Sequence, residues 1–186
     1  MGHLRVVSRY VKSLLDLAVE KGVLEPVHND MQLFAKICRE NRAFTLMLRN
    51  PIIRHDKKRD VLEKLFKGKV NDLTMAIFNI ITRKNREPLL PEIAIEFHNA
   101  YNEHKNIGKA SVITAVPLDA ASRKEFEKII KGILNKSEIE LDESVDKEMI
   151  GGFVLNAGDR QIDASIKNKL KTLKVKLSEN PYVKEF

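Results

Sequence analysis

The chain changes its hydrophobic periodicity once, near residue 108, and this change constrains the fold more than any other feature. Before it, apolar residues recur at intervals of three and four positions, which is the spacing of one face of an α-helix. After it, Ala110 to Val116 alternates as a β-strand does and ends at Pro117. The pattern predicts a mainly α chain with two domains, residues 1–105 and residues 106–186.

Residues 1–105 have the pattern of successive helices joined by short connections. Asn50-Pro51 and Gly68 interrupt the helical spacing. Asp56, and either Asn71 or Asp72, are predicted to cap the helices that follow them. The predicted helices cover approximately residues 7–22, 28–41, 44–48, 57–68, 72–83 and 93–105. Six helices with short connections predict a compact six-helix bundle.

Residues 106–186 are predicted to form a small α+β domain. After the first strand, Asp119 is expected to cap an amphipathic helix that closes near Asn135. Ile139 and Leu141 indicate a second strand. Ala157-Gly158-Asp159 predicts a tight hairpin, because glycine accepts the positive φ that such turns require. The domain is predicted to end in a helix whose apolar stripe consists of Ile166, Leu170, Leu173 and Leu177.

The sequence lacks the spacings typical of catalytic and metal-binding sites. The histidines, at positions 3, 28, 55, 98 and 104, are never three or four residues apart, and the single cysteine, Cys38, excludes an internal disulfide. Gly68-Lys69 lacks the other residues of a phosphate-binding loop. We therefore expect no enzymatic activity, metal or cofactor. Since no signal peptide or spanning segment is recognisable, we expect a soluble protein that reaches a membrane only through partners.

Basic residues leave a second function class open. The net charge is +7, with clusters at residues 54–59 and on the predicted last helix, residues 167–176. A basic helical nucleic-acid-associated protein would place such charges against phosphates. However, Asp56 and Asp60 interrupt the first cluster, and aromatic residues that could stack on bases are missing around both clusters. A solvated surface is the favoured interpretation, and nucleic-acid binding is the alternative.

Two predicted helices carry more apolar residues than one buried face requires. In the helix over residues 71–83 the apolar residues cannot share a face; they are Leu73, Met75, Ala76, Ile77, Phe78, Ile80 and Ile81. In the first helix, Tyr10 and Leu17 lie to one side of the main stripe, with the small Ser13 between them. Either both helices are central and fully buried, or a groove between them accepts an amphipathic helix from a partner.

Several segments, spread over nearly the whole chain, resemble a known family. They are SRYVKSLLDLA at 8–18, KKRDVLEKLFKG at 57–68, LLPEI at 89–93, VITAVPL at 112–118 and, most specific, IGGFVLNAGDRQIDASIKNKL at 150–170. Together they resemble the delta subunit of bacterial F-type ATP synthases, the counterpart of mitochondrial OSCP. Two positions depart from the family: Asn85 precedes Arg86 where the family usually has a glycine, and Ala164 replaces the glycine of Asp-Gly-Ser.

The resemblance implies a non-catalytic stator subunit on the cytoplasmic face of the bacterial plasma membrane, acting in proton-driven ATP synthesis. It implies that the N-terminal six-helix domain binds the N-terminal helix of an alpha subunit between the first and fifth helices. The C-terminal domain is implied to bind the C-terminal region of the b subunit. The residues expected to line the groove are Tyr10, Ser13, Leu14, Leu17, Thr74, Ile77 and Ile81; the Met75/Phe78 side of the fifth helix is the alternative.

Overall fold

The computed structural model describes residues 2–136 and 138–178. The chain divides into two compact units, residues 1–104 and 105–186. The described part is mainly helical, with a four-stranded sheet in the C-terminal unit, and this confirms the predicted class of a mainly α chain with a small α+β part. Within the described residues, each helix is too short or too polar to cross a lipid bilayer.

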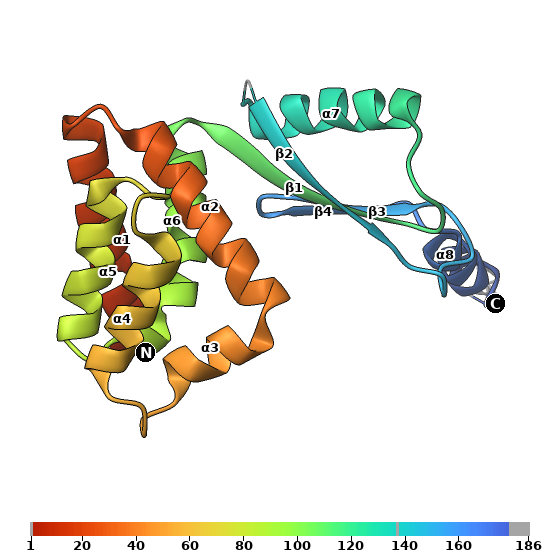
Figure 1. The fold of residues 1–186 in the computed structure, drawn as a ribbon. Helices are drawn as coiled ribbons and strands as arrows, with labels where there is room; N and C mark the ends of the chain where they lie inside the picture. The colour runs from red at the N-terminus through yellow and green to blue at the C-terminus, as the bar shows by residue number, and fades with distance from the viewer. Residues whose placement is uncertain (1, 137, 179–186) are drawn as a thin grey trace, which may run out of the picture. The chain divides into compact units, whose positions relative to one another are not determined.

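The N-terminal unit consists of helices joined by short connections. They are α1 (Gly2–Glu20), α2 (Leu24–Glu40), α3 (Arg42–Arg49), α4 (His55–Phe66), α5 (Asp72–Arg83) and α6 (Leu90–His104), with the 3-10 turn η1 (Glu87–Leu89) before α6. Helix α6 packs along α1 and α2, and α5 packs along α4 (Figure 1). Asn71 caps α5, as predicted, by accepting a hydrogen bond from the Leu73 amide. The predicted cap at Asp56 is wrong, because α4 begins at His55 and Asp56 lies inside its first turn.

A cluster of four phenylalanine rings forms the centre of this unit. Phe34 of α2, Phe44 of α3, Phe66 of α4 and Phe78 of α5 each come from a different helix. The Phe34 ring centroid lies 5.9, 5.5 and 4.9 Å from those of Phe44, Phe66 and Phe78, within the range of favourable edge and tilted contacts. One ring thus joins four helices, and it determines which face each of them turns inward.

The C-terminal unit combines a sheet with two helices. Its elements are β1 (Ile107–Thr114), α7 (Ala120–Leu134), β2 (Glu138–Val145), β3 (Phe153–Ala157), β4 (Arg160–Asp163) and α8 (Ile166–Ser178). The sheet order is β2-β1-β3-β4, and β1 pairs with β2 in parallel through the α7 crossover, whereas the other pairs are antiparallel. Helix α7 lies along one face of the sheet (Figure 1), with Phe126 and Ile130 in the same core as Val112 and Leu155.

Residues with positive φ explain the turns, including the two positions that depart from the resembled family. Gly158 closes the β3–β4 hairpin at φ +58°, as predicted. Asn85 takes φ +54°, which asparagine tolerates better than most residues, so the turn after α5 forms without the glycine that the family usually has there. Ala164 does not take a positive φ, so the start of α8 is conventional. In the C-terminal block, Gly152 also takes a positive φ, +84°.

A buried ion pair joins α4 to the turn before α6. The Lys58 ammonium donates to the Leu48 carbonyl over 2.9 Å and lies 3.9 Å from the Glu87 carboxylate. Only 5% of the Lys58 side chain and 3% of the Glu87 side chain are exposed. In such surroundings the loss of one partner leaves a charge without compensation, which is more harmful than the loss of both.

We expect Lys58→Met to destabilise the chain by about 3–5 kcal/mol, because the buried Glu87 carboxylate loses its counter-ion. Urea unfolding followed by far-UV circular dichroism measures the change. The control is Lys57→Met at the exposed neighbouring position, which should alter the unfolding free energy by less than about 0.5 kcal/mol. Equal effects of the two variants would contradict the role assigned to the pair.

A second expectation concerns Gly152. A Cβ atom added there would lie 2.4 Å from the Ala164 carbonyl oxygen, and the positive φ adds strain, so Gly152→Ala should destabilise the C-terminal unit by about 2 kcal/mol or more. Gly132, inside α7, has open space around an added Cβ, and Gly132→Ala should stabilise by about 0.5–1 kcal/mol. Amide hydrogen exchange in β1 and β3 reports both changes. Slower exchange in the Gly152 variant would refute the steric argument.

Candidate partner-binding surfaces

Helices α1 and α5 lie side by side and run in opposite directions (Figure 1). A polar contact joins the two helices. The Arg86 guanidinium, just after α5, donates to the Tyr10 hydroxyl over 3.1 Å and lies 5.9 Å from the centroid of the Tyr10 ring. The Tyr10 side of α1 therefore faces the C-terminal end of α5.

The structure separates the predicted groove residues into two groups. On α1, Leu17 is 45% exposed, Ser13 is exposed and Tyr10 is half-buried. The others are buried in the core of the unit: Leu14, Thr74, Ile77 and Ile81, none more than 8% exposed. These four lie beneath the surface and hold the helices together, so a partner that docks on the unit as it stands would meet Tyr10, Ser13 and Leu17.

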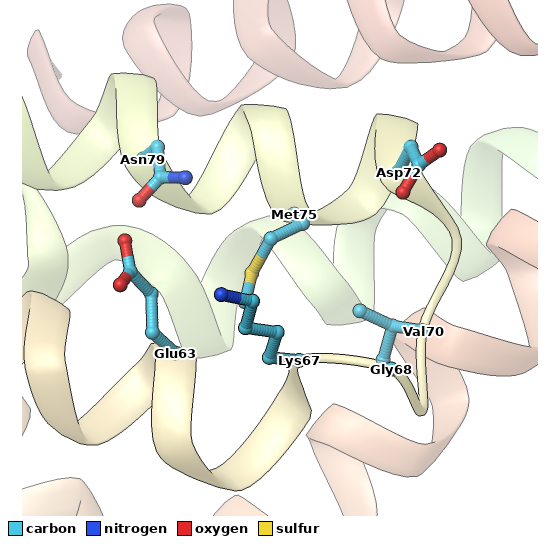
Figure 2. Close-up of a pocket in the computed structure, with 7 residues that line it drawn as sticks. All are labelled: Glu63, Lys67, Gly68, Val70, Asp72, Met75 and Asn79. Carbon is cyan, nitrogen blue, oxygen red and sulfur yellow. The ribbon is translucent and has the colours of Figure 1, made fainter.

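The Met75/Phe78 side of α5 does not face α1. Met75 and Asn79 line a pocket of about 230 Å³ together with Glu63 and Lys67 from the end of α4 (Figure 2). Phe78 belongs to the central ring cluster. The opposite flank of α5 therefore faces α1, and Ile80 on that flank is 48% exposed.

The predicted groove residues did not include Ile80. The sequence had nevertheless placed Ile80 among the apolar residues that cannot all share one face of this helix. Residues at i and i+4 share a helix flank, so Ala76 and Ile80 lie next to each other, and both are exposed. We define the α1/α5 surface as Tyr10, Ser13, Leu17, Ala76 and Ile80. It is an apolar strip of the kind that usually marks an interaction site.

The C-terminal unit presents a second apolar surface on α8. No described side chain of this helix is buried, although its sequence carries the predicted apolar stripe. The exposed fractions are 40% for Ile166, 54% for Leu170, 54% for Leu173 and 85% for Leu177. The other nine positions of Ile166–Ser178 hold five lysines, Asn168, Thr172, Val175 and Ser178, and no acidic residue. We define this stripe, Ile166, Leu170, Leu173 and Leu177, as the α8 surface.

The described residues form no metal site, and the thiol of Cys38 is not activated. Among them, no group of three or more His, Cys, Asp or Glu side chains is placed to hold a metal ion. Burial raises the pKa of the Cys38 thiol to about 11, against a smaller lowering by its hydrogen bond with Thr45, so the thiol stays protonated near neutral pH. The pocket in Figure 2 contains no serine, threonine, cysteine or histidine; its lining residues are Glu63, Lys67, Gly68, Val70, Asp72, Met75 and Asn79.

Known proteins resemble the chain over almost its full length. The family model described as ATP synthase delta (OSCP) subunit matches residues 6–177. ATP synthase subunit delta of Cytophaga hutchinsonii is 40% identical over 96% of this chain and 97% of its own. The corresponding protein of Flavobacterium johnsoniae is 36% identical over 96% of this chain and 99% of its own.

The fold also has a counterpart among solved structures. A chain in the cryo-EM structure of the Toxoplasma gondii mitochondrial ATP synthase hexamer superposes with a TM-score of 0.73 over 92% of this chain and 96% of that one. At 21% identity this match concerns the fold alone. The family model and the bacterial relatives show that this chain belongs to the ATP synthase delta (OSCP) subunit family.

Proposed function

We propose that the chain is the non-catalytic stator subunit that joins the catalytic head of a bacterial F-type ATP synthase to its peripheral stalk. Family membership supports this role most directly. The observation that carries the mechanism is that both units expose apolar side chains along a helix, on the α1/α5 surface in the first unit and on the α8 surface in the second. A connector needs two separate binding surfaces and no reactive groups, so the proposed role is mechanical, at the cytoplasmic face of the membrane in proton-driven ATP synthesis.

In this proposal residues 1–105 are the head-binding domain, a six-helix bundle that receives the N-terminal helix of the alpha subunit on the α1/α5 surface. Leu17 and Ile80 would anchor the apolar face of that helix, and the small Ser13 side chain would permit a close approach of the backbones. An interface of this type buries about 800 Å² on each partner, enough for specific binding.

Residues 106–186 are, in the same proposal, the domain that binds the C-terminal region of the b subunit through the α8 surface. Leu170 and Leu173 supply apolar contact area, and the surrounding lysines favour an acidic partner helix. Two sites on one chain would hold the assembly more tightly than either alone, because the second contact forms within an existing complex.

The nucleic-acid alternative is not favoured. The family assignment provides no support for it. In addition, the lysines of α8 flank an exposed apolar stripe, whereas phosphate binding requires only the charges.

The first test concerns the α1/α5 surface. Leu17→Glu should weaken binding of a synthetic peptide with the N-terminal sequence of the cognate alpha subunit to the full chain by at least about tenfold, since it places a charge in an apolar contact. Leu33→Glu on α2 is the matched control, because Leu33 is 42% exposed and outside this surface. Isothermal titration calorimetry gives both affinities. Equal losses, or absence of binding to the unaltered chain, would disprove the assignment.

The second test concerns the α8 surface. Leu170→Asp with Leu173→Asp should abolish measurable binding of a fragment from the C-terminal region of the b subunit. The affinity for the alpha peptide should stay unchanged, because the two surfaces lie on separate units. No side chain of α8 is buried, so the substitutions should cost little folding stability. Ile129→Asp on α7, where Ile129 is 46% exposed, is the control. Retained binding of the fragment by the double variant would exclude α8 as its site.

A further inference from the structure

Two histidines form a polar contact between α2 and α6 in the N-terminal unit. The Nε2 atom of His28 on α2 lies 2.9 Å from the Nδ1 atom of His98 on α6, a hydrogen-bond distance between two ring nitrogens. The two rings are nearly parallel, with their centroids 5.2 Å apart. His28 is 7% exposed and His98 is half-buried. The two residues are 70 positions apart, so spacing along the chain does not predict the pair.

Few charged groups face this pair. At helical spacings of three and four from either histidine, Glu25 is the one charged side chain and Tyr101 the one other titratable side chain. Lys21 and Lys105 are each seven positions from one of the histidines. Asp30 of α2 is engaged with α5, where it accepts a hydrogen bond from the Thr74 hydroxyl. Helix α1 packs on both helices with apolar side chains.

Tyr101 links the pair to the Glu25 carboxylate. Its ring stacks on the His28 ring, with the centroids 3.6 Å apart and the planes inclined by 7°. Its hydroxyl donates a hydrogen bond to Glu25 over 2.7 Å. A positive charge on His28 would therefore lie over an aromatic face, with a carboxylate at the hydroxyl end of that ring. These surroundings tolerate one added proton on the pair.

The hydrogen bond between the two rings holds a single hydrogen atom. A neutral imidazole has one N–H and one acceptor nitrogen, so in the contact one ring donates and the other accepts. When both rings are protonated, both facing nitrogens carry a hydrogen, and two partly or fully buried cations stand donor against donor. The Asn102 amide nitrogen, 3.3 Å from the Nε2 atom of His98, places a further donor beside that ring. The contact therefore has no room for a second added proton.

We propose that the His28–His98 contact makes the packing of α2 on α6 sensitive to protons: it persists while the pair holds at most one added proton and opens when both rings are protonated. A free histidine takes up a proton at about pH 6.5. The open state then binds one proton more than the closed state, so the contact weakens as the pH falls below that value. Helix α6 is the last helix before β1, so acid loosens the N-terminal unit at the helix that leads into the C-terminal unit. This response does not depend on the proposed stator role.

Amide hydrogen exchange of the full chain, measured at pH 7 and at pH 5.5, tests the opening. We expect the protection factors of the α6 amides around His98 to fall about five- to tenfold between these values, because the open state binds one more proton. Carboxylates take up protons mainly below this window. The amides of β1 belong to the other unit and should keep their protection. Unchanged protection in α6, or an equal loss in β1, would overturn the proposal.

Single substitutions assign the response to the pair. His28→Gln removes one titratable ring and keeps a polar amide near the position of Nε2, so the loss of α6 protection between pH 7 and pH 5.5 should shrink to less than about twofold. His98→Asn is a second, independent variant with the same expected result. His104→Gln is the matched control, because His104 is exposed on the same helix, and this variant should keep the full loss. A full loss in the His28 or His98 variant would overturn the role given to the pair.

Discussion

The N-terminal unit depends on the contacts of one ring, Phe34, with the phenylalanines of α3, α4 and α5. Since Phe78 points into this cluster, α5 has only one rotation about its axis. That rotation turns Met75 toward α4 and leaves Ile80 exposed beside α1. The position of the exposed apolar strip is thus a consequence of the core, and the same packing that stabilises the unit also sets its candidate binding surface.

The C-terminal unit also exposes an apolar helix surface, although fewer side chains are buried in its core. Its core is small, and α8 contributes no buried side chain to it. Polar contacts hold the start of this helix instead: the Ile166 amide donates to the Gly151 carbonyl, and the Ser165 hydroxyl accepts from the Asn168 amide. The characteristic block at residues 150–170 therefore builds a framework, and the apolar residues that extend from it remain available to a partner.

A stator subunit must resist load while its contacts with two partners persist. The structure suits this task because ion pairs and hydrogen bonds between side chains link its helices to one another. The buried Lys58–Glu87 pair ties α4 to the turn before α6. The Arg86–Tyr10 contact ties the end of α5 to α1. Both contacts link separate elements of the N-terminal unit, and their role is structural.

Spacing and residue type in the sequence predicted the helical part and the mixed α+β part of the chain, a cap at Asn71 or Asp72, the hairpin at Gly158 and the surplus of apolar residues on the first and fifth helices. These features are local, because they depend on spacing along one segment. Only the tertiary structure decided that Leu14, Thr74, Ile77 and Ile81 are buried while Leu17 and Ile80 are exposed. Spacing shows that a helix has more than one apolar face, but which face is covered depends on the neighbours that the fold brings against it.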